Sequence, residues 1–216
     1  MLSMNILKKL GDFTLDIALS AGNEAWALLG ASGSGKSMAL KALAGIVTPD
    51  EGRITVDGEV LFDSARGINL SPHERRVGLM FQHYALFPNM TVEENILTGL
   101  NRLAKPLRRV RAGEFIERMQ LTSQKCLYPA QLSGGQRQRV ALARMLASEP
   151  RLIMLDEPFS ALDSHLRWHL EREVYDVLKD FPGTALMVSH NRDEAYRLCA
   201  GIAVLENGRV SATRAR

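Results

Sequence analysis

Residues 30–37 read Gly-Ala-Ser-Gly-Ser-Gly-Lys-Ser, which fits the phosphate-loop pattern of glycine, four residues and Gly-Lys-Ser. An apolar run at 25–29 precedes the loop and a helical pattern at 36–44 follows it. We therefore expect several backbone N–H groups to converge on an anion at a helix N-terminus. Lys36 would place a positive charge near the β- and γ-phosphates of a nucleotide, and the Ser37 hydroxyl would bind Mg²⁺. A chance glycine-rich turn is the alternative, and the flanking strand and helix disfavour it.

A pair of carboxylates follows a second apolar run. Asp156 and Glu157 come directly after Leu152 to Leu155, a pattern that predicts a buried strand with charge at its carboxyl end. In open α/β sheets that edge binds ligands. We expect Asp156 to help hold Mg²⁺ and Glu157 to polarise the water that attacks the γ-phosphate. The alternative is a solvated strand end, which becomes less favoured with Lys36 upstream.

A third stretch, Leu132-Ser133-Gly134-Gly135-Gln136, predicts another helix N-terminus able to bind an anion. An ordinary capped helix would explain Ser133 and Gln136. It would give no reason for the two consecutive glycines.

The N-terminal part of the sequence predicts β structure that would position the loop. Apolar and polar residues alternate over 13–20, and Gly11-Asp12 predicts a turn, so the segment 4–20 is expected to form a hairpin. Asp57-Gly58 predicts a second hairpin. The remaining segments predicted here are an irregular stretch at 64–72 and a buried strand at 77–81.

Helices are predicted between about 83 and 148. Thr91 with Glu94, and Ser133 with Gln136, have the spacing of capping boxes. Pro106 is expected to interrupt the pattern, with a further helix at 111–120. Beyond residue 150 strands and helices alternate, which indicates an α/β fold with a mostly parallel sheet. The predicted strands there are 152–155, 184–188, 202–205 and one near 209–210, and the predicted helices are 164–179 and 193–199.

Composition narrows the class of protein. The 216 residues are 46% hydrophobic and 24% charged, which is ordinary for a globular chain, and a net charge of +3 is too small to indicate nucleic-acid binding. No stretch reaches the roughly 20 apolar residues that span a bilayer, and the N-terminus is unlike a signal peptide. We expect a cytosolic protein that another chain would hold at a membrane. Cys126 and Cys199 are expected to be buried or inert thiols. Two basic clusters are expected to lie on solvated helix faces: Arg108, Arg109 and Arg111 form one, and Arg137, Arg139 and Arg144 form the other.

The three stretches together resemble the ATP-binding subunits of ABC transporters. Leu-Ser-Gly-Gly-Gln lies about twenty residues before Asp156-Glu157, Gln82 ends a predicted strand, and His190 follows the strand residues Met187 to Ser189. Ser160-Ala161-Leu162-Asp163 matches the loop after that family's catalytic glutamate. The resemblance extends from about residue 5 to 212.

The resemblance implies a P-loop NTPase fold with an N-terminal antiparallel β subdomain and an inserted α-helical subdomain. Residues of about 1–82 and 149–216 would form the nucleotide-binding core, residues 83–148 the helical subdomain, and no C-terminal regulatory domain is expected. ATP and Mg²⁺ are the implied cofactors. Two copies would pack head to tail and trap two ATP molecules, so that each site is completed by the opposite copy.

The resemblance also assigns roles to individual residues. The implied catalytic residues are Glu157, His190, Gln82 and Lys36. The implied nucleotide-binding residues are Gly30, Ala31, Ser32, Gly33, Ser34, Gly35, Lys36, Ser37 and Met38, together with Ser133, Gly134, Gly135, Gln136 and Asp163 acting on the opposite copy. The implied Mg²⁺ ligands are Ser37, Gln82 and Asp156.

Narrower features resemble importers of molybdate and related oxyanions, among them Arg75-Arg76-Val77-Gly78 and Leu86-Phe87-Pro88. The implied partners are a second copy, membrane-spanning permease subunits at the cytoplasmic face of the membrane, with Leu86 to Pro88 as the docking region, and indirectly an extracytoplasmic solute-binding protein. Sulfate, ferric iron and polyamine remain alternative solutes. A non-transport ABC switch and a small kinase or GTPase fit less well. The family's adenine-stacking aromatic residue has no clear counterpart, and either Leu10 or Phe13 would contact the base.

Overall fold

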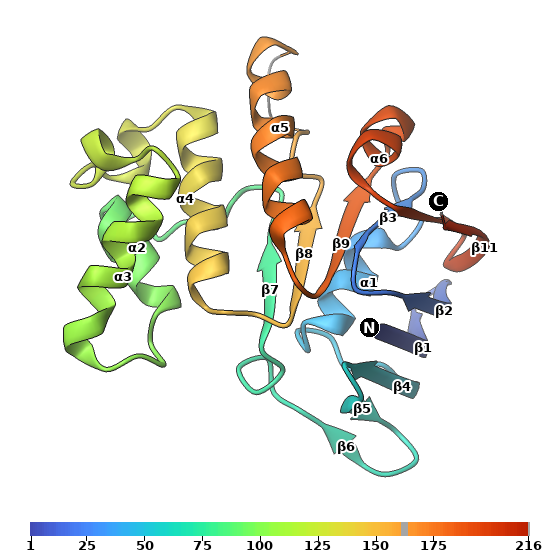
Figure 1. The fold of residues 1–216 in the computed structure, drawn as a ribbon. Coiled ribbons are helices and arrows are strands. Elements are labelled where there is room, and N and C mark those ends of the chain that lie inside the picture. Colours follow the sequence, from blue (N-terminus) through green and yellow to red (C-terminus); the bar gives the residue numbers. More distant parts are fainter. Residues whose placement is uncertain (161–163, 216) are drawn as a thin grey trace. The chain divides into compact units, whose positions relative to one another are not determined.

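The computed structural model describes residues 1–160 and 164–215. The chain divides into two compact units, which are described separately below (Figure 1). The first unit comprises Met1–Leu79, Arg151–Glu157 and Glu171–Arg216, and the second comprises Met80–Pro150 and Pro158–Leu170.

An antiparallel sheet opens the first unit, with the strand order β2-β1-β4-β5-β6. The alternation over 13–20 forms β2 as predicted, with Leu15, Ile17 and Leu19 buried. Within the segment 64–72, expected to be irregular, a two-residue strand pairs Asn69 with Phe62. The strands are β1 (Leu2–Leu10), β2 (Phe13–Ala21), β4 (Glu51–Val56), β5 (Glu59–Asp63) and β6 (Ile68–Asn69).

The second sheet has the order β11-β10-β3-β9-β8-β7, and β10, β3, β9 and β8 run parallel to one another. Strands β8 and β9 are buried throughout, as their uninterrupted apolar sequences predict. The strands are β3 (Ala25–Leu29), β7 (Val77–Met80), β8 (Leu152–Asp156), β9 (Thr184–Ser189), β10 (Gly201–Glu206) and β11 (Arg209–Ala215). Helix α1 (Lys36–Leu43) follows β3, α5 (Ser164–Asp180) connects β8 to β9, and α6 (Arg192–Leu198) connects β9 to β10.

The core of the first unit joins the two sheets through α1. Ala39, Leu40 and Leu43 of this helix are fully buried and belong to one apolar cluster with side chains of β1, β2, β8 and β9. Helix α1 begins where the phosphate loop ends. The packing that fixes the helix therefore also fixes the loop.

Three helices form most of the second unit: α2 (Val92–Gly99), α3 (Lys105–Arg118) and α4 (Gly134–Ala147). Both predicted capping boxes are present, at Thr91 and at Ser133. The second helix was predicted to begin at Arg111, after an interruption at Pro106, and this start was wrong, because α3 begins at Lys105 and Pro106 lies in its first turn. A proline is tolerated there since the first N–H groups of a helix have no intrahelical partner.

Two smaller observations complete the fold. No helix among the described residues is long and apolar enough to cross a bilayer. Cys199 is buried as expected, and burial raises the pKa of its thiol to about 12. Cys126 is exposed, so of the two expected alternatives, a buried or an inert thiol, burial does not apply to it.

Candidate functional site

The loop of residues 30–37 connects β3 to α1. Gly35 is the N-cap of α1 with a φ of 104°, and no side chain caps this helix end. The first N–H groups of α1 are therefore available to an anion. Gly30 is required by close packing, because a Cβ there would lie 2.4 Å from the carbonyl oxygen of Leu205.

Lys36 is the buried cation of the loop. Its side chain is 5% exposed, and Nζ lies 3.9 Å from Oε1 of Glu157. Nζ also donates hydrogen bonds of 2.9 Å to the carbonyl oxygens of Gly30 and Ala31. These bonds hold the ammonium against the inside of the loop, where the sequence predicts a phosphate.

Ser37 and Asp156 lie 119 residues apart in sequence and meet in the fold, with Ser37 Oγ donating a 3.0 Å hydrogen bond to Asp156 Oδ1. Burial raises the pKa of the Asp156 carboxyl, an effect that the hydrogen bond from Ser37 partly offsets. A hydroxyl and a carboxylate are oxygen ligands of the kind that Mg²⁺ prefers. The pair therefore fits a nucleotide-bound Mg²⁺.

Glu157 lies between Lys36 and His190. Its Oε2 is 3.3 Å from Nδ1 of His190, whose side chain is 58% exposed. The backbone of Glu157 adopts a left-handed conformation with φ 46°, and its N–H donates to the carbonyl oxygen of Val188. A glutamate in this conformation is strained, and such strain is often found at functional sites.

The register of the parallel strands explains why these side chains meet. Leu29 pairs with Ser189, and Asp156 pairs with Val188. The chain therefore leaves β3, β9 and β8 at the same edge, with the phosphate loop, His190 and Glu157 as the next residues. This is the carboxyl edge at which open α/β sheets bind ligands.

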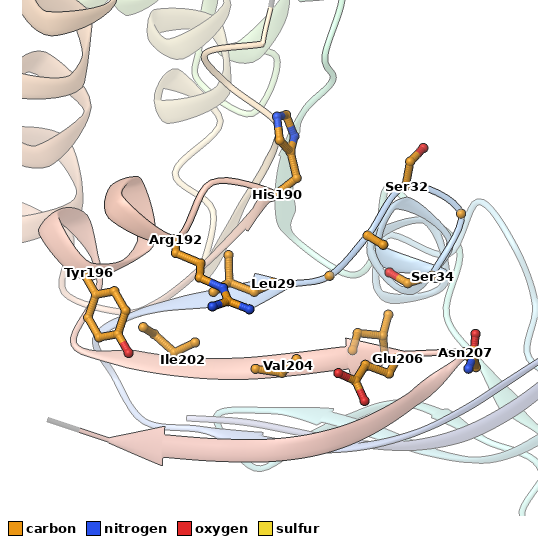
Figure 2. Close-up of a pocket in the computed structure, with 14 residues that line it drawn as sticks. Leu29, Ser32, Ser34, His190, Arg192, Tyr196, Ile202, Val204, Glu206 and Asn207 are labelled. Carbon is orange, nitrogen blue, oxygen red and sulfur yellow. The ribbon is translucent and has the colours of Figure 1, made fainter.

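A pocket of about 700 Å³ opens beside the loop, on the side of Ser32 and His190. Figure 2 shows Arg192 and Tyr196 from α6 over the side chains of β10 that form its floor. Lys36, Ser37 and the two carboxylates do not line it. Residues 30–34 of the phosphate loop form one wall of the pocket, so the pocket adjoins Lys36, Ser37 and the two carboxylates without containing them.

The described residues hold no group of three or more His, Cys, Asp or Glu side chains placed to bind a metal. A hydroxyl with one carboxylate fits an ion that is bound mainly through substrate phosphates. These two ligands are too few to form a Mg²⁺ site from protein groups alone.

The other predicted site residues lie in the second unit. Ser133 caps α4 and accepts a hydrogen bond from the N–H of Gln136, while the Gln136 side chain accepts from the N–H of Ser133. Gln82 Nε2 donates to Ser160 Oγ at 3.1 Å. Asp163 lies outside the described residues. The approach of Gln82 and Ser133 to the phosphate loop stays a prediction.

Three residues near these elements were missed or left open in the sequence. Phe13 lies against the phosphate loop, because a Cβ on Gly35 would be 3.0 Å from its ring. Arg75 is fully buried and binds the last carbonyls of α1. Arg144 was expected on a solvated face, yet its guanidinium binds backbone carbonyls of residues 84 and 85. Arginines in a basic stretch give no sequence signal of burial, although Gly45 marks the end of α1 that Arg75 binds.

Comparison with known proteins places this geometry in context. Residues 14–160 match a family model described as "ABC transporter". A molybdenum import ATP-binding protein ModC of Paramagnetospirillum magneticum is 40% identical over 99% of this chain and 59% of its own length. A sulfate/thiosulfate import ATP-binding protein CysA of Xanthomonas campestris is 44% identical over 93% of this chain and 58% of its own length. This chain thus spans about three fifths of these relatives.

A shorter relative and a solved structure match more fully. A probable sulfate/thiosulfate import ATP-binding protein CysA of Chlorella vulgaris is 43% identical over 95% of this chain and 87% of its own length. The fold is similar to that of the ATP-binding cassette MJ0796, solved as a dimer in a post-hydrolysis state bound to ADP and Pi, with a TM-score of 0.82 and 30% identity. That match covers 100% of this chain and 98% of the other.

Proposed function

The chain belongs to the ABC transporter family, and on that premise we propose that it is the ATP-hydrolysing subunit of an oxyanion importer. The observation that carries the proposal is the cluster at the carboxyl edge of the parallel sheet. There a phosphate-loop lysine, a serine–aspartate pair and a glutamate–histidine pair meet. This set contains the groups that phosphoryl transfer to water needs, namely an anion cradle, oxygen ligands and a base.

Lys36 and the N–H groups at the start of α1 bind the phosphates and hold the γ-phosphate in place. Glu157 accepts a proton from the attacking water, and its contact with Nδ1 of His190 keeps the carboxylate oriented toward that water. Positioning and charge stabilisation account for most of the rate in this chemistry.

Mg²⁺ fits the Ser37 and Asp156 oxygens, and when bound it would neutralise charge on the phosphates. In this proposal Gln82 would be a further ligand. Ser37 fixes the orientation of the carboxylate by donating to Oδ1 of Asp156. Removing Ser37 would therefore weaken the metal site twice, through the lost ligand and through the misplaced carboxylate.

A second copy of the chain completes the site in this proposal. Ser133 to Gln136 would approach the γ-phosphate bound by the opposite copy, and Asp163 would lie between the two. The dimeric cassette MJ0796, which resembles this chain over its whole length, supports the arrangement. The nucleotide-binding core then comprises about 1–82 and 149–216, and residues 83–148 form the helical subdomain.

The import names of the relatives support association with permease subunits at the cytoplasmic face of the membrane. The segment Leu86 to Pro88 would form the docking region, and a solute-binding protein would act through the permease. Relatives named for molybdenum and for sulfate match at 40% and 44% identity, which supports an oxyanion as the solute. Molybdate is our first choice, and sulfate is the main alternative.

The decisive variant is Glu157→Gln, which removes the base and keeps the size of the side chain. Hydrolysis of ATP by the full chain should fall by about 100-fold or more. Binding of ATP should persist, because Lys36 and the loop are unchanged, and dimers should form in ATP. Glu117→Gln, at an exposed position of α3, is the matched control and should keep full activity. Near-normal hydrolysis by Glu157→Gln would remove the proposed base.

A further inference from the structure

The backbone just after Gln82 is strained. Tyr84 and Ala85 are consecutive non-glycine residues with φ angles of 61° and 44°, both in the left-handed region. A single such residue is uncommon, and two in succession persist only where neighbouring groups hold them. The Tyr84 side chain is buried, so the turn is anchored at one side.

Arg144, from the third turn of α4, holds this turn directly. Its Nη2 donates to the carbonyl oxygen of Tyr84 at 2.9 Å and its Nη1 to that of Ala85 at 2.8 Å. The same guanidinium lies over the ring of Phe87, with Cζ 5.3 Å from the ring centroid. One planar fork thus fixes two adjacent carbonyls and the next aromatic side chain.

Helix α2 holds the other end of the segment. Fully buried Asn95 accepts a hydrogen bond from the N–H of Phe87, and its two amide N–H groups are shared among the carbonyl oxygens of Phe87, Met90 and Thr91. Helices α2 and α4 also approach closely, because a Cβ on Gly99 would lie 2.3 Å from the carbonyl oxygen of Arg144. Residues 84–91 are therefore clamped between two helices at fixed spacing.

These contacts connect two elements that the proposed function assigns to the γ-phosphate. Gln82 lies two residues before the strained turn. Ser133 caps the N-terminus of the same α4 that carries Arg144 about three turns further on. Helix α4 is continuous from its N-cap Ser133 to Arg144, so the backbone of residues 84 and 85 cannot change conformation without breaking its hydrogen bonds to α4.

We propose that Arg144 is a positioning residue for ATP hydrolysis, which clamps the strained turn after Gln82 to the helix that begins at Ser133. The inference rests on the proposed function. Arg144 acts through Gln82 and through the start of α4, and it contacts no nucleotide itself. Its loss should lower the rate of hydrolysis and leave ATP binding intact, because the phosphate-binding groups belong to the other unit.

The first experiment compares kcat for ATP hydrolysis with the Kd for ATP. Arg144→Met should lower kcat by about tenfold and change Kd by less than about twofold. Arg144→Lys should lose about threefold in kcat, because an ammonium keeps a charge over Phe87 but cannot supply two parallel N–H groups. Arg109→Met, at an exposed position of α3, is the control and should match the wild type.

The second experiment separates positioning from general support of the fold. Glycine adopts positive φ at little cost, so Ala85→Gly should let the turn keep its shape without Arg144. Ala85→Gly alone should change kcat by less than about twofold. Combined with Arg144→Met, or with Arg144→Lys if the methionine variant folds poorly, it should recover at least half of the lost rate on a logarithmic scale. Purely additive effects, or a loss of ATP affinity equal to the loss of kcat, would overturn the proposal.

Amide hydrogen exchange provides a readout that does not need activity. Arg144→Met should speed exchange over 83–87 and at the first turn of α4, with no change in the β3 amides. If the wild-type chain had no ATPase activity, the proposed function would be refuted. Hydrogen exchange would still test whether Arg144 holds residues 84 and 85. Unchanged exchange over 83–87 would refute the clamp alone.

Discussion

The buried guanidinium of Arg75 offers the sharpest test of how the phosphate loop is supported. Arg75 is 0% exposed. Its Nη1 donates to the carbonyl oxygens of Ala42 and Leu43, the last turn of α1, at 2.7 and 2.9 Å. Nε donates to Leu70 and Nη2 to Asn69, both at 2.9 Å. The positive charge therefore sits at the negative end of the helix dipole whose other end forms the phosphate site.

Arg75→Met removes these donors with little change in side-chain volume. The buried carbonyl of Leu43 would lose its bond to Arg75, which costs about 1–3 kcal/mol, and the carbonyl of half-buried Leu70 should cost less. The Ala42 carbonyl also accepts from the N–H of Gly45 and should cost less. Relief from burying a charge offsets part of the loss. We expect a net destabilisation of about 2 kcal/mol, which corresponds to a fall in Tm of about 4–8 °C for a chain of this size.

Urea titration followed by circular dichroism measures this free energy. Arg76→Met is the matched control, because Arg76 is the next residue and its side chain is exposed. The control makes the same change in net charge and should alter stability by less than about 0.5 kcal/mol. A loss below about 1 kcal/mol for Arg75→Met, or equal losses for the two variants, would show that the buried hydrogen bonds at the end of α1 contribute little.

Three further predictions concern the proposed metal ligand Asp156, the packing of the helical unit and the side chain that contacts the adenine. Burial raises the pKa of the Asp156 carboxyl, so ionisation at that position opposes folding above the pH at which the group titrates. Asp156→Asn should therefore raise Tm at pH 7, by an amount that shrinks as the pH falls toward 3.8, the ordinary pKa of this carboxyl. It should also abolish the Mg²⁺ dependence of nucleotide binding, and a lower Tm at pH 7 would contradict the prediction. Gly99→Ala should destabilise the chain by about 2 kcal/mol or more in the same urea assay, because the new Cβ would lie 2.3 Å from a backbone carbonyl oxygen of α4. Gly113→Ala is the control: its Cβ would meet open space within a helix, so this variant should be more stable than the wild type by about 0.5–1 kcal/mol. Phe13→Ala should weaken ATP binding more than Leu10→Ala does in a titration by fluorescence, since the Phe13 ring lies against the phosphate loop. Equal effects of the two variants would contradict the assignment of the adenine contact to Phe13.

Local patterns in the sequence predicted most of the elements. The capping boxes at Thr91 and Ser133 and the hairpin turns at Gly11 and Asp57 depend on contacts within a few residues, so their signals are complete in the sequence. Pro106 was misjudged because the same residue ends one helix or begins another, depending on where the first turn falls.

The roles of individual residues in the candidate site were harder to predict from the sequence than the helices and strands. The phosphate loop, Asp156-Glu157 and His190 were found from their spacing and from a family resemblance, and the sequence alone could not show that they meet. No signal in the sequence indicated that Arg75 and Arg144 bind backbone carbonyls. Burial of an arginine depends on which distant carbonyls surround it, and neighbouring residues do not encode that.

The sequence by itself determined that a phosphate loop lies between a strand and a helix, because glycine spacing and apolar periodicity act over a few residues. Only the tertiary structure decided that Glu157 stands between Lys36 and His190. That arrangement follows from the pairing of β3 and β8 on either side of β9. The strand order is a cooperative property of the whole core, since each strand finds its neighbour through burial that no single segment specifies.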